Sequence, residues 1–544
     1  MINTIAIDLT PVLPGGENGG AKVFLLELLN SLATYRPNVK FILLTRSESH
    51  KELHFLDREN MKRLLVLVDG ATIPPEKIAF SLKRLNSNFL SRFFESFKKL
   101  FFPLSSEEKS LGKQNSLMQI LGADLLFCPF TAMTYADPGI PSVSTIYDWQ
   151  HRVYPQFFEP TEVIQRDQTL DFVCRHAAAI ATISDFSRCD TLKYGGVDST
   201  RVKTIYLRMA NRTNKIASDD FSIFQKINIQ PQKYFIYPAN FWRHKNHEML
   251  LTAFRIAIHT GLSTDFKLIL TGAPSARRNF LMSAAKKMGL EDSVLFPGYL
   301  STHELSILMK NSRGLVFPSL YEGFGLPPIE AMSLGVPVAC SNFASLPEIV
   351  SSAVSLFDPR QPEEIAKNML LLQNDGALRE GLIELGLKRA AFFADSQRMT
   401  QEYWSLFEQA VLCPNKKFTI TGVYPDGGWL QECFRVEVIF SDSLKNLELE
   451  IEAPAINKDN RIGLRIRTEG PNVNTQNIFV ENGTKKKISI DLIGAGAIYF
   501  EVLNTFTPDE VLGNGDKRKL SLILKSCRIN KVDGSFIELF SENK

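Results

Sequence analysis

The chain has 544 residues, which is too long for a single hydrophobic core and predicts two to four domains. Its hydrophobic content of 44% and its charged content of 22% are typical of a globular protein. The 62 lysines and arginines nearly balance the 59 aspartates and glutamates, so the net charge of +3 gives no electrostatic footprint for nucleic acid, and no nucleic-acid partner is expected.

The first part of the chain alternates short apolar runs with stretches of helical spacing. Residues 21–35 have the spacing of a helix, and five runs of strand length precede or follow them. Alternating strands and helices predict a parallel sheet that helices cover on both faces. The predicted strands are 4–9, 39–45, 123–130, 141–148 and 177–184.

A glycine-rich loop, "PGGENGG", separates the first predicted strand from the first predicted helix. It has neither the G-x-x-x-x-G-K-[ST] pattern of a P-loop nor the G-x-G-x-x-G fingerprint, so a nicotinamide site is not expected. The pair Gly19 and Gly20 directly precedes the helix, whereas Gly15 and Gly16 suit a turn.

Residues 80–103 carry apolar side chains at helical spacing, with lysines and arginines around them. A basic, aromatic amphipathic helix of this kind can lie on an anionic membrane. The alternative is an ordinary surface helix that packs on the protein core.

The alternation of strands and helices restarts after residue 232, with a predicted helix at 247–261. Residues 207–232 are polar and have no clear period, which predicts a linker between two similar domains, 1–215 and 216–412. Two such doubly wound domains form a cleft, and ligands bind outside the carboxyl ends of their strands. The predicted strands of the second domain are 234–240, 266–272, 293–298, 314–319 and 337–341.

The pattern changes to period two in residues 413–544, where turn signals such as "ENGT" and "GNGD" separate the runs. This predicts an antiparallel all-β domain, most simply a sandwich. Tyr424, Trp429 and Phe434 could form a sugar-binding platform, or they could be buried aromatics of the sandwich. The predicted strands are 447–455, 461–468, 485–492, 497–503 and 520–529.

The stretch "YEGFGLPPIE" (321–330) places a glycine loop before a helix that begins with two prolines. Proline suits the first helical turn, and a helix N-terminus behind glycines is a ready phosphate site. We expect Glu330 in the first turn, where its carboxylate can accept bonds from a ribose diol. Glu322 would face the other end of the ligand. The alternatives are that Glu330 only complements the helix dipole and that Glu322 is a surface residue.

Two further helix starts carry capping signals. Ser345 and Glu348 have the S-x-x-E spacing of a capping box, which predicts that they open one helix together. Ser184 precedes another helical stretch and is expected to act as its N-cap.

The string "PSLYEGFGLPPIEAMSLGVPVAC", together with "VLFPGYLSTHELSILMKNSRGLVFPS", closely resembles the E-x7-E signature of the family 4 retaining glycosyltransferases. The resemblance covers about residues 1–405 and implies the GT-B fold, in which two Rossmann-like domains face a cleft. It also implies an enzyme that moves a hexose, such as mannose, from a nucleotide sugar to a saccharide acceptor in surface-polysaccharide synthesis.

The resemblance assigns donor-binding roles within the second domain. Glu330 would bind the donor ribose, and Glu322 would hold hydroxyls of the transferred sugar near the reaction centre. The other residues that it places beside the donor are Gly298 and Tyr299 near the base, and the backbone amides of Gly323, Phe324, Gly325 and Leu326.

The segment "NFWRHKNHEMLL" (240–251) resembles the family's clamp for the diphosphate. Lys245 matches the usual lysine, but Ala239 stands where the family often has an arginine. Arg243 is the substitute that the sequence offers, and the alternative is a solvated residue at a helix start. His244 and His247 form one i, i+3 pair without a third ligand, so no metal site is expected.

In the first domain, Gly19 and Gly20 fall where similar transferases place a glycine pair beside the donor phosphates and the acceptor. The segment "STIYDWQHRVYPQFF" (144–158) resembles the family's His-Asp-x-x-His segment, which approaches the donor sugar. Here Tyr147 stands in place of the first histidine, while Asp148 and His151 remain. These three residues complete the predicted catalytic set with Glu322, although His151 could equally be a structural histidine.

The resemblance implies front-face displacement, in which a departing phosphate oxygen takes the proton of the acceptor hydroxyl, without a cofactor or metal. The expected partners are a GDP- or UDP-linked sugar and a glycan or polyprenyl-linked saccharide. The competing interpretation is a catalytically silent glycan-binding or scaffold homologue, motivated by Tyr147, Ala239 and the extra β domain.

Seven scattered cysteines without a C-x-x-C pair fit a reducing cytosol. The first residues lack the features of a signal peptide, and no run of 18 apolar residues occurs. We therefore expect a cytoplasmic protein, with a peripheral position at the inner face of the membrane as the further option.

Overall fold

The structure is a computed structural model that forms two compact units, the larger with both parallel sheets and the smaller with the C-terminal strands. The predicted amphipathic segment 80–103 lies outside the described residues. These are residues 2–15, 18–68, 71–73, 117–137, 140–209, 222–412, 418–423, 428–438, 444–455, 461–469, 475–492, 497–505, 521–531, 534 and 536–541.

The first sheet has eight strands in the order β4-β3-β2-β1-β5-β6-β7-β8, and every pair is parallel except β3 with β4. All five predicted strands are confirmed, whereas the partly exposed β3 and the short β4 and β8 were not predicted. The strands are β1 (Thr4–Asp8), β2 (Lys40–Arg46), β3 (Met61–Val68), β4 (Ala71–Thr72), β5 (Leu125–Cys128), β6 (Ser142–Ile146), β7 (Ala179–Thr182) and β8 (Val202–Thr204).

We call residues 2–209 the first half of the larger unit. Its helices alternate with its strands, as the sequence pattern predicts. Helix α1 buries one apolar face against the sheet, including Phe24, Leu25 and Leu28. The helices are α1 (Gly19–Tyr35), α2 (Ser47–His50), η1 (Glu52–Leu56), α5 (Leu117–Leu121), α6 (Gln150–Val153), η3 (Pro155–Phe157), α7 (Pro160–His176), α8 (Asp185–Gly195) and η4 (Ser199–Arg201).

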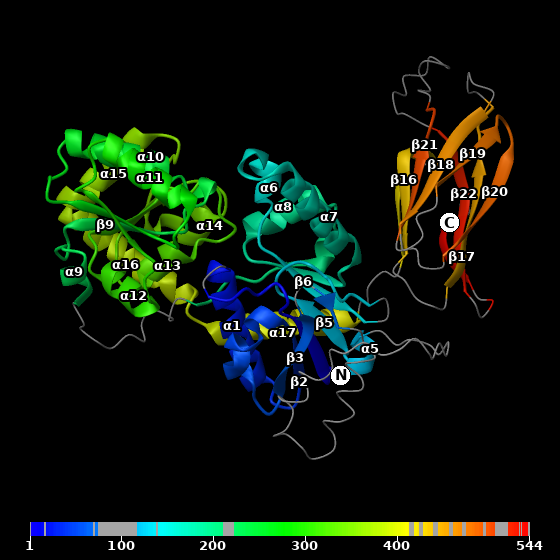
Figure 1. Ribbon diagram of the computed structural model, residues 1–544, viewed down its shortest axis with the longest axis horizontal. Coiled ribbons are helices and arrows are strands. Elements are labelled where there is room, and N and C mark those ends of the chain that lie inside the picture. The colour runs from blue at the N-terminus through cyan, green and yellow to red at the C-terminus, as the bar shows by residue number, and fades with distance from the viewer. Residues whose placement is uncertain are drawn as a thin grey trace. The chain divides into compact units, whose positions relative to one another are not determined.

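The second half of the larger unit, residues 222–392, contains a second sheet. This sheet has six parallel strands in the order β11-β10-β9-β12-β13-β14. All five predicted strands are confirmed, and only the three-residue strand β14 was not predicted. Figure 1 shows α10 and α15 on one side of this sheet and α13 and α16 on the other. The strands are β9 (Tyr234–Pro238), β10 (Lys267–Thr271), β11 (Val294–Gly298), β12 (Gly314–Phe317), β13 (Val338–Ser341) and β14 (Ser355–Phe357).

The last helix of the larger unit returns to the first sheet. Figure 1 shows α17 beside α1, and Thr400 of α17 donates a hydrogen bond to the Ser31 hydroxyl at 2.6 Å. Residues 396–412 thus pack on the first half, although they follow the second half in sequence. The remaining helices are α9 (Ser222–Lys226), η6 (Arg243–Lys245), α10 (His247–His259), α11 (Ala276–Lys287), α12 (Thr302–Lys310), α13 (Leu326–Ser333), α14 (Leu346–Val350), η7 (Ser351–Ala353), α15 (Pro362–Asn374), α16 (Gly376–Phe392) and α17 (Ser396–Leu412).

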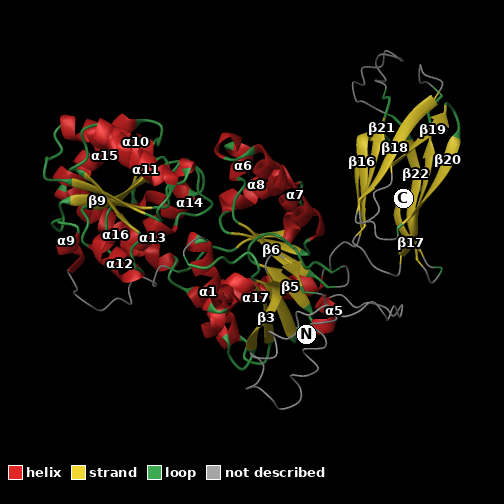
Figure 2. Cartoon of the chain, viewed as in Figure 1, coloured by secondary structure: helices red, strands yellow, loops and turns green. Residues whose placement is uncertain are grey.

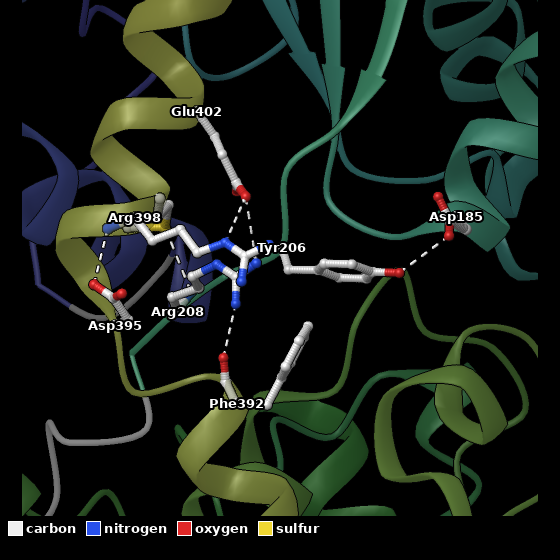
Figure 3. Close-up of polar contacts among 8 residues, drawn as sticks. Asp185, Tyr206, Arg208, Phe392, Asp395, Arg398 and Glu402 are labelled. Carbon is white, nitrogen blue, oxygen red and sulfur yellow. Dashed lines mark hydrogen bonds and ion pairs between the residues drawn. The ribbon is translucent and has the colours of Figure 1, made fainter.

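The chain therefore crosses between the halves twice, after β8 and again between α16 and α17. Arg208 joins the two crossings, because its guanidinium donates to the Phe392 carbonyl at 2.7 Å and lies 3.4 Å from the Glu402 carboxylate (Figure 3). Arg208 is 1% exposed, and a buried cation held by a carbonyl and a carboxylate ties the crossings firmly together.

The C-terminal unit consists of two antiparallel sheets, with strand orders β15-β16-β21-β18-β19 and β20-β17-β22-β23. Figure 2 shows only strands among its described elements, and apolar residues from both sheets form one core, which confirms the predicted all-β sandwich. The strands are β15 (Phe418–Val423), β16 (Leu430–Val438), β17 (Leu444–Glu452), β18 (Arg461–Glu469), β19 (Thr475–Glu481), β20 (Lys485–Asp491), β21 (Ala497–Val502), β22 (Ile523–Lys531) and β23 (Phe536–Ser541).

Phe434 does not contribute to a sugar-binding platform. It is 2% exposed and stacks on Phe500 with ring centroids 4.2 Å apart, so the alternative of a buried sandwich aromatic is correct for it. Tyr424 lies outside the described residues. Within the described part of the chain, no helix has the length and apolar character needed to cross a membrane.

Candidate active site

The glycine loop at the carboxyl end of β12 leads directly into α13. Gly325 is the N-cap residue with φ +103, a conformation that favours glycine, and the prolines occupy the first turn as predicted. The expectation that Glu330 lies in the first turn is wrong, because the helix already begins at Leu326 and Glu330 is its fifth residue. Glu330 is 6% exposed, so it lies buried within the packing of the helix rather than on its exposed end.

Serine hydroxyls hold three consecutive carbonyl groups of this loop. Ser345 donates to Glu322 O at 2.8 Å and to Phe324 O at 3.1 Å, and Ser184 donates to Gly323 O at 2.7 Å. In a trans peptide the N–H points opposite to the C=O. The amides of residues 323–325 therefore point away from these serines, and they have no hydrogen-bond partner among the described residues.

The predicted capping box of Ser345 and Glu348 does not form. Ser345 makes no capping bond to α14, because its hydroxyl holds the loop carbonyls instead. The Glu348 carboxylate accepts bonds from the backbone of Asp185 and Phe186 in the first half. Both side chains bond to groups that are distant in sequence instead of to the start of α14, and the S-x-x-E spacing does not reveal those distant groups. The predicted N-cap role of Ser184 is confirmed, because its side chain accepts from Ser187 N.

Lys245 and Glu322 form an ion pair with 2.5 Å between Nζ and Oε1. Their side chains are only 13% and 12% exposed, so this pair is shielded from solvent far more than a surface salt bridge. Lys245 lies on η6, and the backbone carbonyl of His244 in the same short helix accepts a bond from Leu320 N. The structure thus brings the predicted diphosphate lysine and the predicted sugar-binding glutamate together.

Arg243 lies on the same short helix but is exposed. It lines a cavity of about 570 Å³ with Arg277 and Phe280 of α11, beside an ion pair of Arg277 with Glu248. Its predicted role at the diphosphate stays a prediction. At the end of β11, Gly298 has φ +85 and Tyr299 is 69% exposed, so this aromatic ring is accessible to a ligand.

Of the two histidines near Lys245, His247 is buried and His244 is half-buried, and desolvation lowers the pKa of His244 to about 2 and that of His247 to about 3. Both are neutral at physiological pH, so they add no positive charge to the predicted diphosphate site. No group of three His, Cys, Asp or Glu side chains within the described ranges could hold a metal ion.

The predicted glycine pair of the first half meets the loop of the second half. Helix α1 begins at Gly19, and a Cβ on Gly20 would lie 2.8 Å from the Leu326 side chain. Glycine at this position therefore permits the close approach of the two helix starts.

Sequence reasoning missed Lys22, which organises the loop before α1. Lys22 is 5% exposed, and its ammonium donates to Leu13 O at 2.8 Å and Gly15 O at 2.9 Å and pairs with Glu52 at 2.7 Å. The available signal was its position three residues before Leu25 on the apolar face of α1, where a lysine must find partners.

Tyr147 packs in the first half, where its ring and that of Phe24 meet in a T-shaped arrangement, and its hydroxyl donates to Pro129 O at 2.9 Å. Burial raises the pKa of this hydroxyl well above its usual value, so it stays protonated. Its single O–H is thus committed to Pro129, and toward a sugar it can only accept a hydrogen bond.

His151 faces its own half. It is 1% exposed, its Nε2 lies 2.7 Å from the Asp167 carboxylate, and its ring stacks on Trp149. Burial lowers its pKa, although Asp167 acts in the opposite direction. The Asp148 carboxylate accepts from Gln150 N at 3.0 Å at the start of α6. The structure therefore does not bring His151 to Glu322 and favours the structural alternative for this histidine.

Tyr321, which also escaped sequence reasoning, reaches from the loop into the first half. Its hydroxyl donates to the Asp190 carboxylate at 2.8 Å and accepts from Trp149 N at 3.4 Å. It is 3% exposed, so these bonds anchor the loop at the position directly before Glu322. The signal was an amphipathic aromatic next to the candidate glutamate, which a single sequence does not distinguish from a core residue.

Comparison with known proteins extends these observations. The sequence profile of the family described as "Glycosyl transferases group 1" matches residues 219–389. The "O-antigen chain mannosyltransferase B" of Escherichia coli is 30% identical over 261 residues, which cover 48% of this chain and 68% of that protein. The "O-antigen chain mannosyltransferase RfbU" of Salmonella typhimurium is 28% identical over 186 residues, 34% of this chain and 47% of that protein.

Solved structures match both parallel sheets. A sucrose-phosphate synthase from Thermosynechococcus elongatus aligns with a TM-score of 0.55 at 18% identity, over 75% of this chain and 98% of that one. WaaG, a glycosyltransferase involved in lipopolysaccharide biosynthesis, aligns with a TM-score of 0.53 at 13% identity, over 74% of this chain and 99% of that one. At these identities the likeness concerns the fold, and it confirms the predicted pair of Rossmann-like halves.

Proposed function

The chain belongs to the group 1 glycosyltransferases, and on this premise we propose that it transfers mannose, with retention of configuration, from a nucleotide sugar to a saccharide acceptor of surface-polysaccharide synthesis. The choice of mannose is supported by relatives whose names state O-antigen mannosyl transfer. A GDP-linked sugar is the preferred donor in this proposal, and a UDP-linked hexose is the second candidate.

The observation that carries the proposal is the shielded ion pair of Lys245 with Glu322, beside the unpartnered amides of residues 323–325. A cation and backbone N–H groups at a helix start suit a diphosphate. A carboxylate next to them suits hydroxyls of the sugar that the diphosphate carries. Glu330, farther along α13, is proposed to bind the ribose.

Catalysis in this arrangement rests on positioning and on charge stabilisation. Lys245 and the amides would stabilise the charge that develops on the leaving diphosphate. The acceptor hydroxyl would attack the face that the nucleotide leaves and pass its proton to the departing phosphate oxygen. We propose that no metal is needed, because the ammonium and the helix start supply the positive charge.

The acceptor is proposed to be a glycan or polyprenyl-linked saccharide that approaches from the first half near Gly20. The proposal places the reaction in the cytoplasm, which is supported by five free cysteines among the described residues. Contact with an anionic membrane through residues 80–103 remains part of the proposal.

A catalytically silent homologue is the second candidate, because the Tyr147 hydroxyl and His151 are bound within their own half. The test incubates the full-length protein with GDP-mannose, UDP-hexoses and ADP-glucose and measures sugar release or transfer. We expect turnover of one donor and a loss of about 10²-fold or more in Glu322→Ala, equal to about 2.7 kcal/mol of transition-state stabilisation. Absence of turnover with every donor would support the silent homologue, whereas full activity of the variant would refute the proposed role of Glu322.

A further inference from the structure

The start of helix α8 in the first half is capped by a carboxylate from the second half. Glu348 accepts a bond from Asp185 N at 2.7 Å through Oε1 and from Phe186 N at 2.9 Å through Oε2. The first amides of a helix lack partners within it, and the helix dipole favours a negative charge there. Glu348 thus makes two charge-assisted bonds across the boundary between the halves.

The backbone around Glu348 is fixed within its own half. Arg389 of α16 donates to Glu348 O and to Ile349 O, both at 2.7 Å. Three residues earlier, Ser345 holds the Glu322 and Phe324 carbonyls. One short segment therefore carries both the support of the Glu322 loop and the carboxylate that reaches the first half.

The start of α8 returns the contact at the same place. Ser184, the N-cap of α8, donates to Gly323 O, which lies between the two carbonyls that Ser345 holds. Tyr206, which follows β8 at the first chain crossing, donates to the Asp185 carboxylate at 3.1 Å (Figure 3). A Cβ on Gly323 would clash with the Tyr147 carbonyl, so this junction tolerates little displacement.

We propose that Glu348 is a positioning residue of the transfer reaction. Its carboxylate locks the start of α8 against the loop of residues 322–325 and so sets the distance of Glu322 from the acceptor side of the first half. It makes no contact with donor or acceptor in this role. The inference rests on the proposed function for its kinetic consequence, but the contact can be tested without activity.

The contact is tested by hydrogen exchange of the full-length protein, read on peptides that contain Asp185 and Phe186. In Glu348→Ala we expect at least about tenfold faster exchange at the start of α8, because both amides lose their acceptor. Glu304→Ala is the matched control, since Glu304 caps its own helix α12 through Ser301 N at 2.9 Å within one half. The control should leave α8 unchanged, and an unchanged rate in Glu348→Ala would overturn the proposal.

The kinetic test compares the same variants with the donor that the wild type turns over. We expect kcat to fall at least about tenfold in Glu348→Ala with the donor KM within about threefold, because the nucleotide site itself is intact. Glu348→Gln, which keeps one acceptor oxygen, should recover part of the loss. A merely structural role would lower the melting temperature of both Ala variants equally and leave kcat unchanged, and that result would overturn the proposal. Lack of any wild-type turnover contradicts the proposed function, while the exchange result still decides the contact.

Discussion

The loop of residues 319–326 and the segment of residues 147–151 meet where Gly323 packs against the Tyr147 carbonyl, yet their polar groups are used in opposite ways. In the loop, serines hold the carbonyls, the amides of residues 323–325 have no partner among the described residues, and Glu322 pairs with Lys245. In the segment, Tyr147 and His151 are bound to Pro129 and Asp167 of their own half. This difference supports our proposal that charged groups of the second half carry the chemistry and that the first half supplies a surface of fixed shape.

The largest expected effect is that of Lys245→Ala. The change removes the proposed diphosphate cation and leaves Glu322 as a shielded carboxylate without its partner. We expect kcat/KM to fall about a thousandfold, equal to about 4 kcal/mol. Steady-state kinetics with the preferred donor provides the measurement.

Lys233→Ala is the matched control for this prediction, because Lys233 forms an exposed pair with Asp265 at 2.8 Å in the same half. Exposed pairs contribute less than about 1 kcal/mol, so its kinetics should stay within about twofold of the wild type. Equal losses in both variants would break the assignment of the chemistry to the loop.

Local sequence predicted the loop because strand end, glycines, prolines and helix follow one another within a few residues. Gly325 has the positive φ that favours glycine, and Pro327 lies in the first turn of α13, where proline is well tolerated. The partners of His151 and Glu348 could not be predicted, because Asp167 lies on another helix and Asp185 lies in the other half. A short local motif carries no information about the distant groups with which its side chains can bond, and the predicted capping box failed for that reason.

Gly323→Ala tests how closely the two segments must approach. Its added methyl would meet the Tyr147 carbonyl oxygen, which is backbone and cannot move aside cheaply. We expect about a hundredfold lower kcat, equal to about 2.7 kcal/mol. Gly381→Ala in α16 is the control, since a Cβ there meets nothing within 4 Å and should stabilise the helix by about 0.5–1 kcal/mol. Wild-type kcat in Gly323→Ala would show that the contact is dispensable.

The protonation state of Asp8, at the carboxyl end of β1, tests whether the first half presents a neutral group rather than a charged one at this strand end. Burial raises its pKa to about 6, although bonds from Thr10 act in the opposite direction. A raised pKa in the folded state means that the stability contributed by the neutral form is present at low pH and is lost as the pH rises from about 4 to about 6.

Asp8→Asn removes this titration while keeping an oxygen acceptor for Thr10. We expect the variant to gain about 1–2 kcal/mol of unfolding free energy over the wild type above about pH 6, and no gain at pH 4. Denaturant unfolding of both proteins at each pH gives the difference, in which other titrating groups cancel. A difference that does not change with pH would mean that Asp8 is charged and satisfied in the folded state.

The smallest expected effect is that of Tyr147→Phe. This variant tests most directly whether the segment of residues 147–151 takes part in the chemistry. The variant loses the bond to Pro129 and should unfold about 1 kcal/mol more easily, whereas kcat/KM should change less than about threefold. Tyr234→Phe is the matched control, because the Tyr234 hydroxyl donates to the Leu308 carbonyl at 2.6 Å inside the second half. Similar losses of stability with unchanged kinetics would mean that the Tyr147 hydroxyl contributes to stability only. A tenfold loss of activity confined to Tyr147→Phe would mean that its hydroxyl accepts a bond from the substrate, and the first half would then take part in the chemistry.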